Sequence, residues 1–253
     1  MSTPTEDGVS FYSQIAPEFH ASYSSDPNRI ERVRVWRNFL ERYAPDAHFA
    51  YDIGCGSGVL SCDLAGRGIE TIGIDGAAGM LSVANRTAQT YGLRNVSFRQ
   101  ERLPIADVAD WRRADLVVSS SAIEYLESIP EALTFLSNLL RDGGVTIFSV
   151  SNRDSFSRTM VRAVHAVTGR PHYLSFLRHF MTAEQIQGAI ATAGLVYLEH
   201  AYFGGADRLN RLLGRCLPPR FASNMIIVAA SKPGAAGRDD REQFERQPAE
   251  AGA

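Results

Sequence analysis

The chain has 253 residues and a formal net charge of -2, with 45% hydrophobic and 21% charged residues. This composition suits one α/β domain, and the small net charge argues against nucleic-acid binding through phosphate neutralisation. Three cysteines without a CxxC spacing favour free thiols in a reducing, cytoplasmic setting over a disulfide framework or a zinc site. Neither a signal-peptide pattern nor an apolar run long enough to span a bilayer is present, so we expect no stable membrane insertion.

The N-terminal part predicts a disordered start followed by a lid and a helix. Residues 1–9 are polar, and we expect them to be disordered. Residues 10–45 then combine an aromatic, irregular segment over 11–23 with a helix over 28–43. In that helix apolar residues recur every three or four positions, which gives one apolar face.

From residue 49 onward, short apolar runs alternate with helical stretches. The runs predict five strands, and the stretches between them predict helices. The strands are expected at 49–53, 70–74, 95–99, 114–119 and 144–149, and the helices at 58–65, 77–91 and 129–141. Such alternation is typical of a parallel sheet with helices on both faces, hence of a doubly wound, Rossmann-like α/β fold.

The chain changes character after the fifth strand. Residues 152–180 are too long and too patterned for a plain loop, and their apolar spacing predicts two helices, over 156–167 and 173–180. We expect this helical insert to lie as a lid over the carboxyl ends of the strands.

The last predicted elements complete the sheet. Thr182, with Gln185 at the third helical position, predicts a capped helix that runs to Ala193. Two further strands, near 195–203 and 225–231, should form an antiparallel pair at the edge of a seven-stranded sheet. Residues 232–253 lack core-forming side chains and are expected to be a disordered tail.

The most informative motif is the glycine-rich turn after the first strand, YDIGCGSG over 51–58. Glycines at 54, 56 and 58 let a ligand lie against bare backbone, because glycine has no Cβ and tolerates positive φ. A dinucleotide fingerprint would need a glycine where Val59 stands, and a P-loop would need a lysine that is absent. The second strand ends in Asp75, about 20 residues after the loop, where an acid accepts hydrogen bonds from a ribose diol.

These two motifs, with the strand end DLVVSSS over 115–121, resemble the class I S-adenosylmethionine-dependent methyltransferases. By the order of its elements the resemblance covers residues 10–231, while its specific motifs lie between 51 and 126. It implies one methyltransferase domain, S-adenosylmethionine as cofactor and a small-molecule acceptor. No Asp/His cluster in the sequence calls for a metal.

The resemblance also implies the residues of the cofactor site. Gly54 and Gly56 would line the methionine moiety with Cys55 between them, and Asp52 would orient the loop or meet the amino group. Asp75, followed by Gly76, would receive the ribose hydroxyls, with a helix N-cap as the alternative reading of the acid.

The remaining cofactor contacts carry open alternatives. Met80 is placed either against the adenine or in the core, and Gln100 or Glu101 would serve the adenine amino group. Ser119, at the end of the fourth strand, should approach the cofactor with its backbone, and Tyr12 should close the site as part of an aromatic lid.

The acceptor side gives weaker signals. The segment after the fourth strand lacks the Asn/Asp-Pro-Pro-Tyr run of base and glutamine methylation, and Tyr125 stands where ubiquinone-type O-methyltransferases commonly have a histidine. The general base therefore stays unassigned, with His172 and His179 of the insert as the leading candidates beside Tyr125. The arginine-rich insert also suits an anionic acceptor, although a solvated helical face explains it equally well.

We therefore expect a small-molecule methyltransferase that acts on oxygen, with a quinone-like or secondary-metabolite acceptor. The alternatives are a methyltransferase-fold protein that binds the cofactor without methyl transfer, such as a cyclase or a silent partner subunit, and an NAD-dependent oxidoreductase. The sequence leaves a homodimer open.

Overall fold

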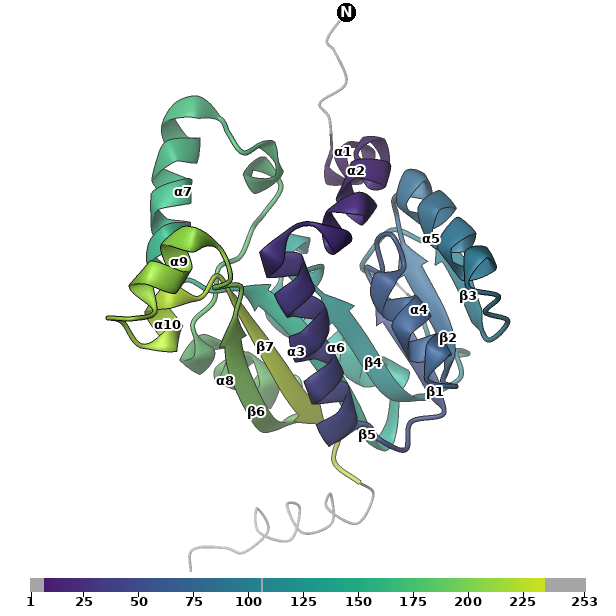
Figure 1. Ribbon diagram of the computed structural model, residues 1–253. Coiled ribbons are helices and arrows are strands. Elements are labelled where there is room, and N and C mark those ends of the chain that lie inside the picture. Colours follow the sequence, from purple (N-terminus) through teal and green to yellow (C-terminus); the bar gives the residue numbers. More distant parts are fainter. Residues whose placement is uncertain (1–6, 106, 235–253) are drawn as a thin grey trace, which may run out of the picture.

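The computed structural model describes residues 7–105 and 107–234, except for the side chain of Arg208. Its centre is one sheet of seven strands, which are β1 (Phe49–Ile53), β2 (Glu70–Asp75), β3 (Val96–Gln100), β4 (Ala114–Ser120), β5 (Leu140–Ser151), β6 (Val196–Phe203) and β7 (Met225–Ser231). They lie side by side in the order β3-β2-β1-β4-β5-β7-β6 (Figure 1).

The direction of the strands confirms the predicted Rossmann-like sheet. β3, β2, β1, β4 and β5 are parallel, and β7 runs antiparallel to both β5 and β6 at the far edge. The chain passes from β1 outward to β2 and β3, then returns to β4 on the other side of β1. The carboxyl ends of β1 and β4 are therefore the topological switch point, where doubly wound sheets bind their ligands.

Helices cover both faces of the sheet, as the nearly continuous burial along β1, β4 and β7 requires. They are α3 (Pro27–Tyr43), α4 (Val59–Gly66) and α5 (Ala78–Thr90) before β4, and α6 (Ile129–Leu139) and α8 (Ala183–Thr192) after it. Leu116 of β4 packs in one apolar cluster with Leu40 of α3 and Leu64 of α4. Its neighbour Val117 packs in the opposite cluster with Leu133 of α6. Two apolar layers thus hold the sheet between them.

Of two helix ends predicted from the local sequence, the start of α8 is confirmed and the end of α6 is wrong. The Thr182 side chain accepts a hydrogen bond from the Gln185 N–H and Gln185 caps in return, so α8 opens as predicted. The expected extension of α6 to residue 141 is wrong, because Leu140 already pairs with Ala114 in the sheet. The pairing then jumps to Val145, and the glycines expected to stop the helix lie within β5 instead.

The segment predicted to be irregular over 11–23 is helical. It forms α1 (Gly8–Gln14), α2 (Ala16–Ala21) and the 3-10 helix η1 (Ser22–Ser24). The carboxylate of Asp7 accepts a hydrogen bond from the Ser10 N–H and caps α1, so residues 7–9 are ordered, contrary to expectation. Residues 1–6 of the expected disordered start, and residues 235–253 of the expected tail, lie outside the described residues.

The insert after β5 is only partly as expected. α7 (Phe156–Thr168) forms, but the second predicted helix is replaced by the four-residue 3-10 helix η3 (His172–Ser175). α7 and the α1–α2 pair rise on opposite sides of the carboxyl ends of the strands (Figure 1). Four apolar side chains of α7 face outward rather than into the protein, namely Phe156, Met160, Val164 and Val167. Two short helices that the sequence did not predict, α9 (Arg208–Leu213) and α10 (Pro219–Ala222), lie beside α7 (Figure 1).

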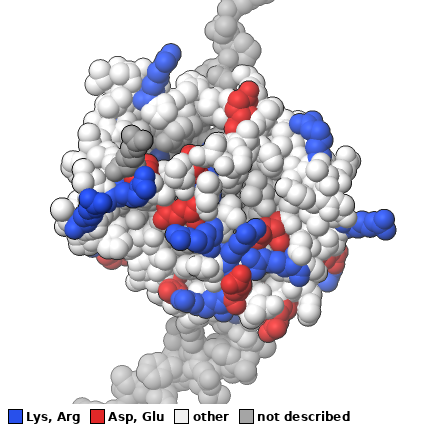
Figure 2. Space-filling view, in the orientation of Figure 1, with Lys and Arg blue, Asp and Glu red and all other residues white. Residues whose placement is uncertain are grey.

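The surface carries charges of both signs. In Figure 2 basic and acidic side chains lie next to one another across the face that α3 crosses. Arg37 pairs with Asp63 and Arg42 with Glu199, each at 2.6 Å. Within the described ranges, none of the helices has both the length and the apolar character to cross a bilayer.

Candidate active site

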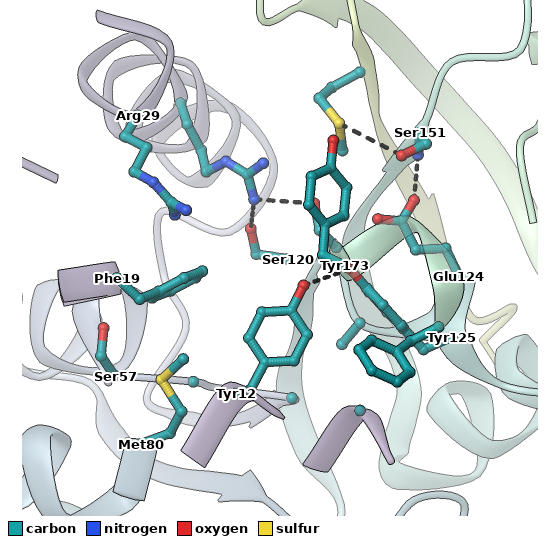
Figure 3. Close-up of a pocket in the computed structure, with 18 of the residues that line it drawn as sticks. Tyr12, Phe19, Arg29, Ser57, Met80, Ser120, Glu124, Tyr125, Ser151 and Tyr173 are labelled. Carbon is teal, nitrogen blue, oxygen red and sulfur yellow. Dashed lines mark hydrogen bonds between the residues drawn. The ribbon is translucent and has the colours of Figure 1, made fainter. Parts of the chain in front are cut away.

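A cavity of about 1190 Å³ lies at the switch point of the sheet. One part, the loop half, is lined by the glycine turn after β1, the end of β2 and Met80 of α5. The other part, the arginine half, is lined by Arg32 of α3, Glu124, Arg158 of α7 and Tyr173 of η3. Tyr12 lies between the two halves (Figure 3).

The three glycines of the turn have positive φ, for different reasons. A Cβ on Gly54 would lie 2.1 Å from Cβ of Ala122, so this glycine lets the ends of β1 and β4 touch. A Cβ on Gly58 would lie 2.7 Å from that of Ala84 in α5. A Cβ on Gly56 would meet nothing closer than Phe19, at 3.9 Å, so Gly56 borders open space. The loop half is thus a cradle with bare backbone at its floor.

Asp52 supplies a buried acceptor below this cradle. It is 1% exposed, and its Oδ2 accepts a hydrogen bond of 2.6 Å from the Ser61 hydroxyl. Its Oδ1 is buried without a partner among the described residues. Burial raises the pKa of Asp52 from 3.8 to about 7, since the low-dielectric site disfavours the charged form. An unsatisfied buried carboxylate oxygen is costly, and it favours a bound donor.

Asp75 fixes the shape of the same half. Its carboxylate accepts the Gly56 N–H at 2.9 Å and the Ala77 N–H at 2.8 Å, which ties the glycine turn to the start of α5. Burial is the main cause that raises its pKa, and the backbone donors oppose it. Asp75 lines the cavity, but the helix N-cap weighed as the alternative from sequence is wrong, because the N-cap of α5 is Ala77, which makes no side-chain capping bond.

Most of the other predicted cofactor residues also border the cavity. Cys55, Gly76 and Tyr12 line it. Met80 is 2% exposed and packs with Ala16 in a small apolar cluster, yet it lines the cavity as well. The two alternatives for Met80 are thus compatible.

Three predicted cofactor residues are not brought to the cavity. Gln100 points back along the chain and donates to the Gly76 carbonyl at 3.3 Å, and Glu101 is exposed. Ser119 is fully buried, and its hydroxyl donates a hydrogen bond of 2.9 Å to the Ile53 carbonyl, which links β4 to β1. Their places in the lining are taken by the residues that follow them, Arg102, Leu103, Ser120 and Ser121.

The two candidate histidines also lie outside the cavity lining, contrary to expectation. His172 is exposed, and its ring contacts Phe11 and Phe176. The Nε2 of His179 lies within 3.1 Å of the carbonyl oxygens of Leu126 and Glu127, which ties the insert to the loop after β4. Tyr125, in contrast, lines the cavity, and its hydroxyl lies 2.6 Å from that of Tyr12.

The arginine half contains residues that the sequence did not single out. Arg32 donates to the hydroxyls of Ser120 and Ser121, at 3.1 and 2.9 Å, and Ser121 has the strained φ of 57°. Arg158 donates to the Tyr173 hydroxyl at 2.7 Å. Apolar spacing points out core positions and not inward-facing arginines, so nothing in the local pattern separated these two from surface arginines.

The loop half fits the cofactor that the sequence resemblance implies. The free oxygen of Asp52 is placed to receive an ammonium group, the open space at Gly56 admits a ligand against the backbone, and Asp75 lies at the ribose position of doubly wound folds. Within the described ranges, no three His, Cys, Asp or Glu side chains gather in an arrangement that could hold a metal ion.

Comparison with known proteins agrees with this geometry. The family model of a methyltransferase domain matches residues 27–200. The chain is 32% identical over 184 residues to a protein named ubiquinone biosynthesis O-methyltransferase from Dinoroseobacter shibae, which covers 72% of this chain and 67% of that protein.

Two solved structures illustrate the shared fold. The crystal structure of the cyclase SpnF superimposes with a TM-score of 0.65 at 18% identity, covering 93% of this chain and all of that one. The N-methyltransferase NodS from Bradyrhizobium japonicum, in complex with S-adenosyl-L-homocysteine, gives a TM-score of 0.58 at 19% identity, covering 84% of this chain and 91% of that one.

Proposed function

This chain belongs to the S-adenosylmethionine-dependent methyltransferases, and we propose that it methylates a hydroxyl oxygen of a small, quinone-like aromatic acceptor. S-adenosylmethionine is its cofactor, and methyl transfer is its activity. The observation that carries the choice of oxygen and acceptor class is the similarity to a ubiquinone biosynthesis O-methyltransferase across most of both chains.

The residues of the loop half would hold the cofactor. Asp52 Oδ1 would accept a hydrogen bond from its amino group, Gly56 would allow the methionine moiety to lie against the backbone, and Asp75 would receive the ribose hydroxyls. When bound, the cofactor supplies an electrophilic methyl group on a sulfonium. The protein has to align the acceptor oxygen with that group, exclude water and remove the hydroxyl proton.

The arginine half supports a small acceptor of mixed polarity. Its walls combine the ring of Tyr173 and apolar groups such as Val161 and Phe203 with two guanidinium groups and several hydroxyls. The aromatic ring of the acceptor would pack against Tyr173 and the apolar groups, and its oxygen substituents would contact the guanidinium groups and the hydroxyls. The net charge of -2 also favours a small molecule over nucleic acid.

Methyl transfer to a defined panel tests this proposal. The purified protein is incubated with methyl-labelled S-adenosylmethionine and matched catechols, anilines and thiophenols, and mass spectrometry with NMR locates the label. We expect label on the catechol oxygen. Label on nitrogen, sulfur or carbon in place of oxygen, or cofactor binding without any transfer, would contradict the proposed oxygen methylation.

A further inference from the structure

We propose that Glu124 is the general base of this reaction, and that Arg32 and Arg158 stabilise the acceptor oxyanion formed when it takes the proton. This inference rests on the proposed oxygen methylation. It fills the place that neither His172 nor His179 can take, because neither ring borders the cavity.

Glu124 is held rigidly, with one carboxylate oxygen left for a ligand. It lies in the 3-10 helix η2 (Ile123–Tyr125) directly after β4, is 3% exposed and lines the cavity. Its Oε2 accepts a hydrogen bond from the Ser151 N–H at the end of β5 (Figure 3). Apart from an interaction between the carboxylate and the Ser151 hydroxyl, its Oε1 receives no hydrogen bond from any described residue. A fixed carboxylate with one free oxygen at a cavity wall is the geometry that a base requires.

Two guanidinium groups, those of Arg158 and Arg32, interact electrostatically with the Glu124 carboxylate. Arg158 is fixed by the Tyr173 hydroxyl at 2.7 Å and the Asn224 carbonyl at 3.4 Å, and Arg32 by two serine hydroxyls. Within the described part of the chain, neither arginine makes an ion pair within 4.0 Å. Arg32 and Arg158 thus lie near the Glu124 carboxylate and can also stabilise a negative charge on the acceptor oxygen.

Asp207, Tyr12 and Tyr125 also line the cavity, but they are poorer bases than Glu124. The oxygens of Asp207 already accept hydrogen bonds from Asn28 and Asn210. Burial raises the pKa of Tyr12 to about 12 and also raises the pKa of Tyr125 well above its ordinary value, so both phenols stay neutral at physiological pH. Burial, as the largest cause, also raises the pKa of Glu124 against the opposing arginines, which makes this carboxylate a stronger base.

The proton transfer balances without a change in net charge. The acceptor hydroxyl gives its proton to Glu124, and the negative charge moves from the carboxylate to the acceptor oxygen, still facing both arginines. The oxygen then bonds to the methyl carbon while the carbon–sulfur bond breaks and leaves its electron pair on sulfur. The proton on Glu124 returns to solvent when the ether product leaves.

The decisive comparison is Glu124→Gln against acceptors of different acidity. Glutamine keeps an oxygen for the Ser151 N–H but cannot take a proton, and Glu127→Gln, an exposed neighbour, is the matched control. With unsubstituted catechol we expect kcat of Glu124→Gln to fall by about 10²- to 10⁴-fold while KM changes little. With 4-nitrocatechol, which ionises near neutral pH by itself, most of the loss should be recovered. An unchanged kcat with catechol would overturn the proposal.

A binding measurement tests the same residues without turnover. 4-Nitrocatechol is added to protein loaded with S-adenosylhomocysteine, at a pH where the free catechol is still protonated, and its visible absorbance and the protons released are followed. The wild type should bind the catecholate and keep its proton, Glu124→Gln should release about one proton more, and Arg158→Gln should need a higher pH to form the catecholate. Equal proton release by the wild type and Glu124→Gln would contradict the proposal.

Two controls keep the outcomes separate. If the wild type methylates neither catechol, the proposed function fails, while the binding measurement still decides whether Glu124 takes the proton. If Glu124→Gln does not fold, Glu124→Asp retains the charge on a shorter side chain. We expect that variant to lose at least about tenfold in kcat at unchanged KM, and wild-type kcat would count against the base.

Discussion

The hydroxyl oxygens of Tyr12 and Tyr125 lie 2.6 Å apart and join α1 to the 3-10 helix that follows β4. α1 is also held to α5, because the Ser13 hydroxyl accepts the Gly79 N–H at 2.7 Å. On its other side the ring of Phe11 contacts Phe176, after η3. Through these contacts α1 forms a roof over the cavity.

Tyr12→Phe tests whether α1 closes over the bound cofactor. The variant loses the hydroxyl bond and leaves Tyr125 without its partner, at a cost of about 1 kcal/mol. We expect the Kd for S-adenosylhomocysteine, measured by calorimetry, to rise by roughly threefold to tenfold. Tyr91→Phe, on an exposed ring away from the cavity, is the control. An unchanged Kd would mean that α1 does not close over the cofactor.

Alanine at Gly54 and at Gly56 should give opposite phenotypes. At Gly54 the new Cβ collides with Ala122, so we expect the fold to lose stability, seen as a lower Tm. At Gly56 the Cβ has room, and the positive φ costs about 1–2 kcal/mol. This variant should fold but lose most of its affinity for S-adenosylhomocysteine. If Gly56→Ala bound as tightly as the wild type, the cofactor could not lie against this backbone.

Asp52→Asn should change how stability depends on pH. The folded pKa of Asp52, about 7, is above the value of 3.8 expected for the unfolded chain. Between these values the folded state keeps a proton that the unfolded state has lost, so the free energy of unfolding falls as pH rises through this window. Urea unfolding at about pH 5 and about pH 8 should show a smaller fall in Asp52→Asn than in the wild type. Asp46→Asn, at the surface, should match the wild type.

The same group should make cofactor binding depend on pH. Ionised Asp52 attracts an ammonium group and the protonated form does not, so wild-type affinity for S-adenosylhomocysteine should rise as pH passes about 7. In Asp52→Asn we expect a weaker affinity that stays flat over this range. A parallel rise in both proteins would show that another group controls binding.

Alanine at His172 or His179 should leave turnover close to that of the wild type. The His172 ring packs on Phe11 and Phe176, and His179 contacts two backbone carbonyls, so neither reaches the cavity. We expect kcat within about twofold of the wild type, with a small loss of stability for His179→Ala. A large fall in kcat at unchanged Tm would restore a histidine as the base.

The sequence predicted the sheet well, because buried parallel strands appear as apolar runs and the glycine turn is contiguous. The α1 and α2 helices, η3, α9 and α10 were missed or misplaced for a common reason. Such short helices depend on tertiary contacts, such as the Asp7 cap and the ring packing around Phe11, more than on their own periodicity.

The two halves of the cavity also differed in how much of each could be predicted from the sequence. The loop half comes from residues close together in the chain, so Gly56 and Asp75 could be named from the motif spacing and Asp52 from the family resemblance. The arginine half contains Arg32 and Arg158, which are far apart in the chain, so sequence spacing could not predict that they line the same cavity. Gln100 and Ser119 show the limit even at strand ends, since a shift of one or two positions moves a side chain away from the cavity.

The division of the cavity walls has an evolutionary consequence. The glycine turn directly follows β1 and Asp75 ends β2, whereas Arg158 and Tyr173 lie on an insert that adds no strand to the sheet. Mutations in the insert can therefore reshape the acceptor pocket without disturbing the strands that carry the cofactor. A lineage can keep its methyl donor while it exchanges one acceptor for another.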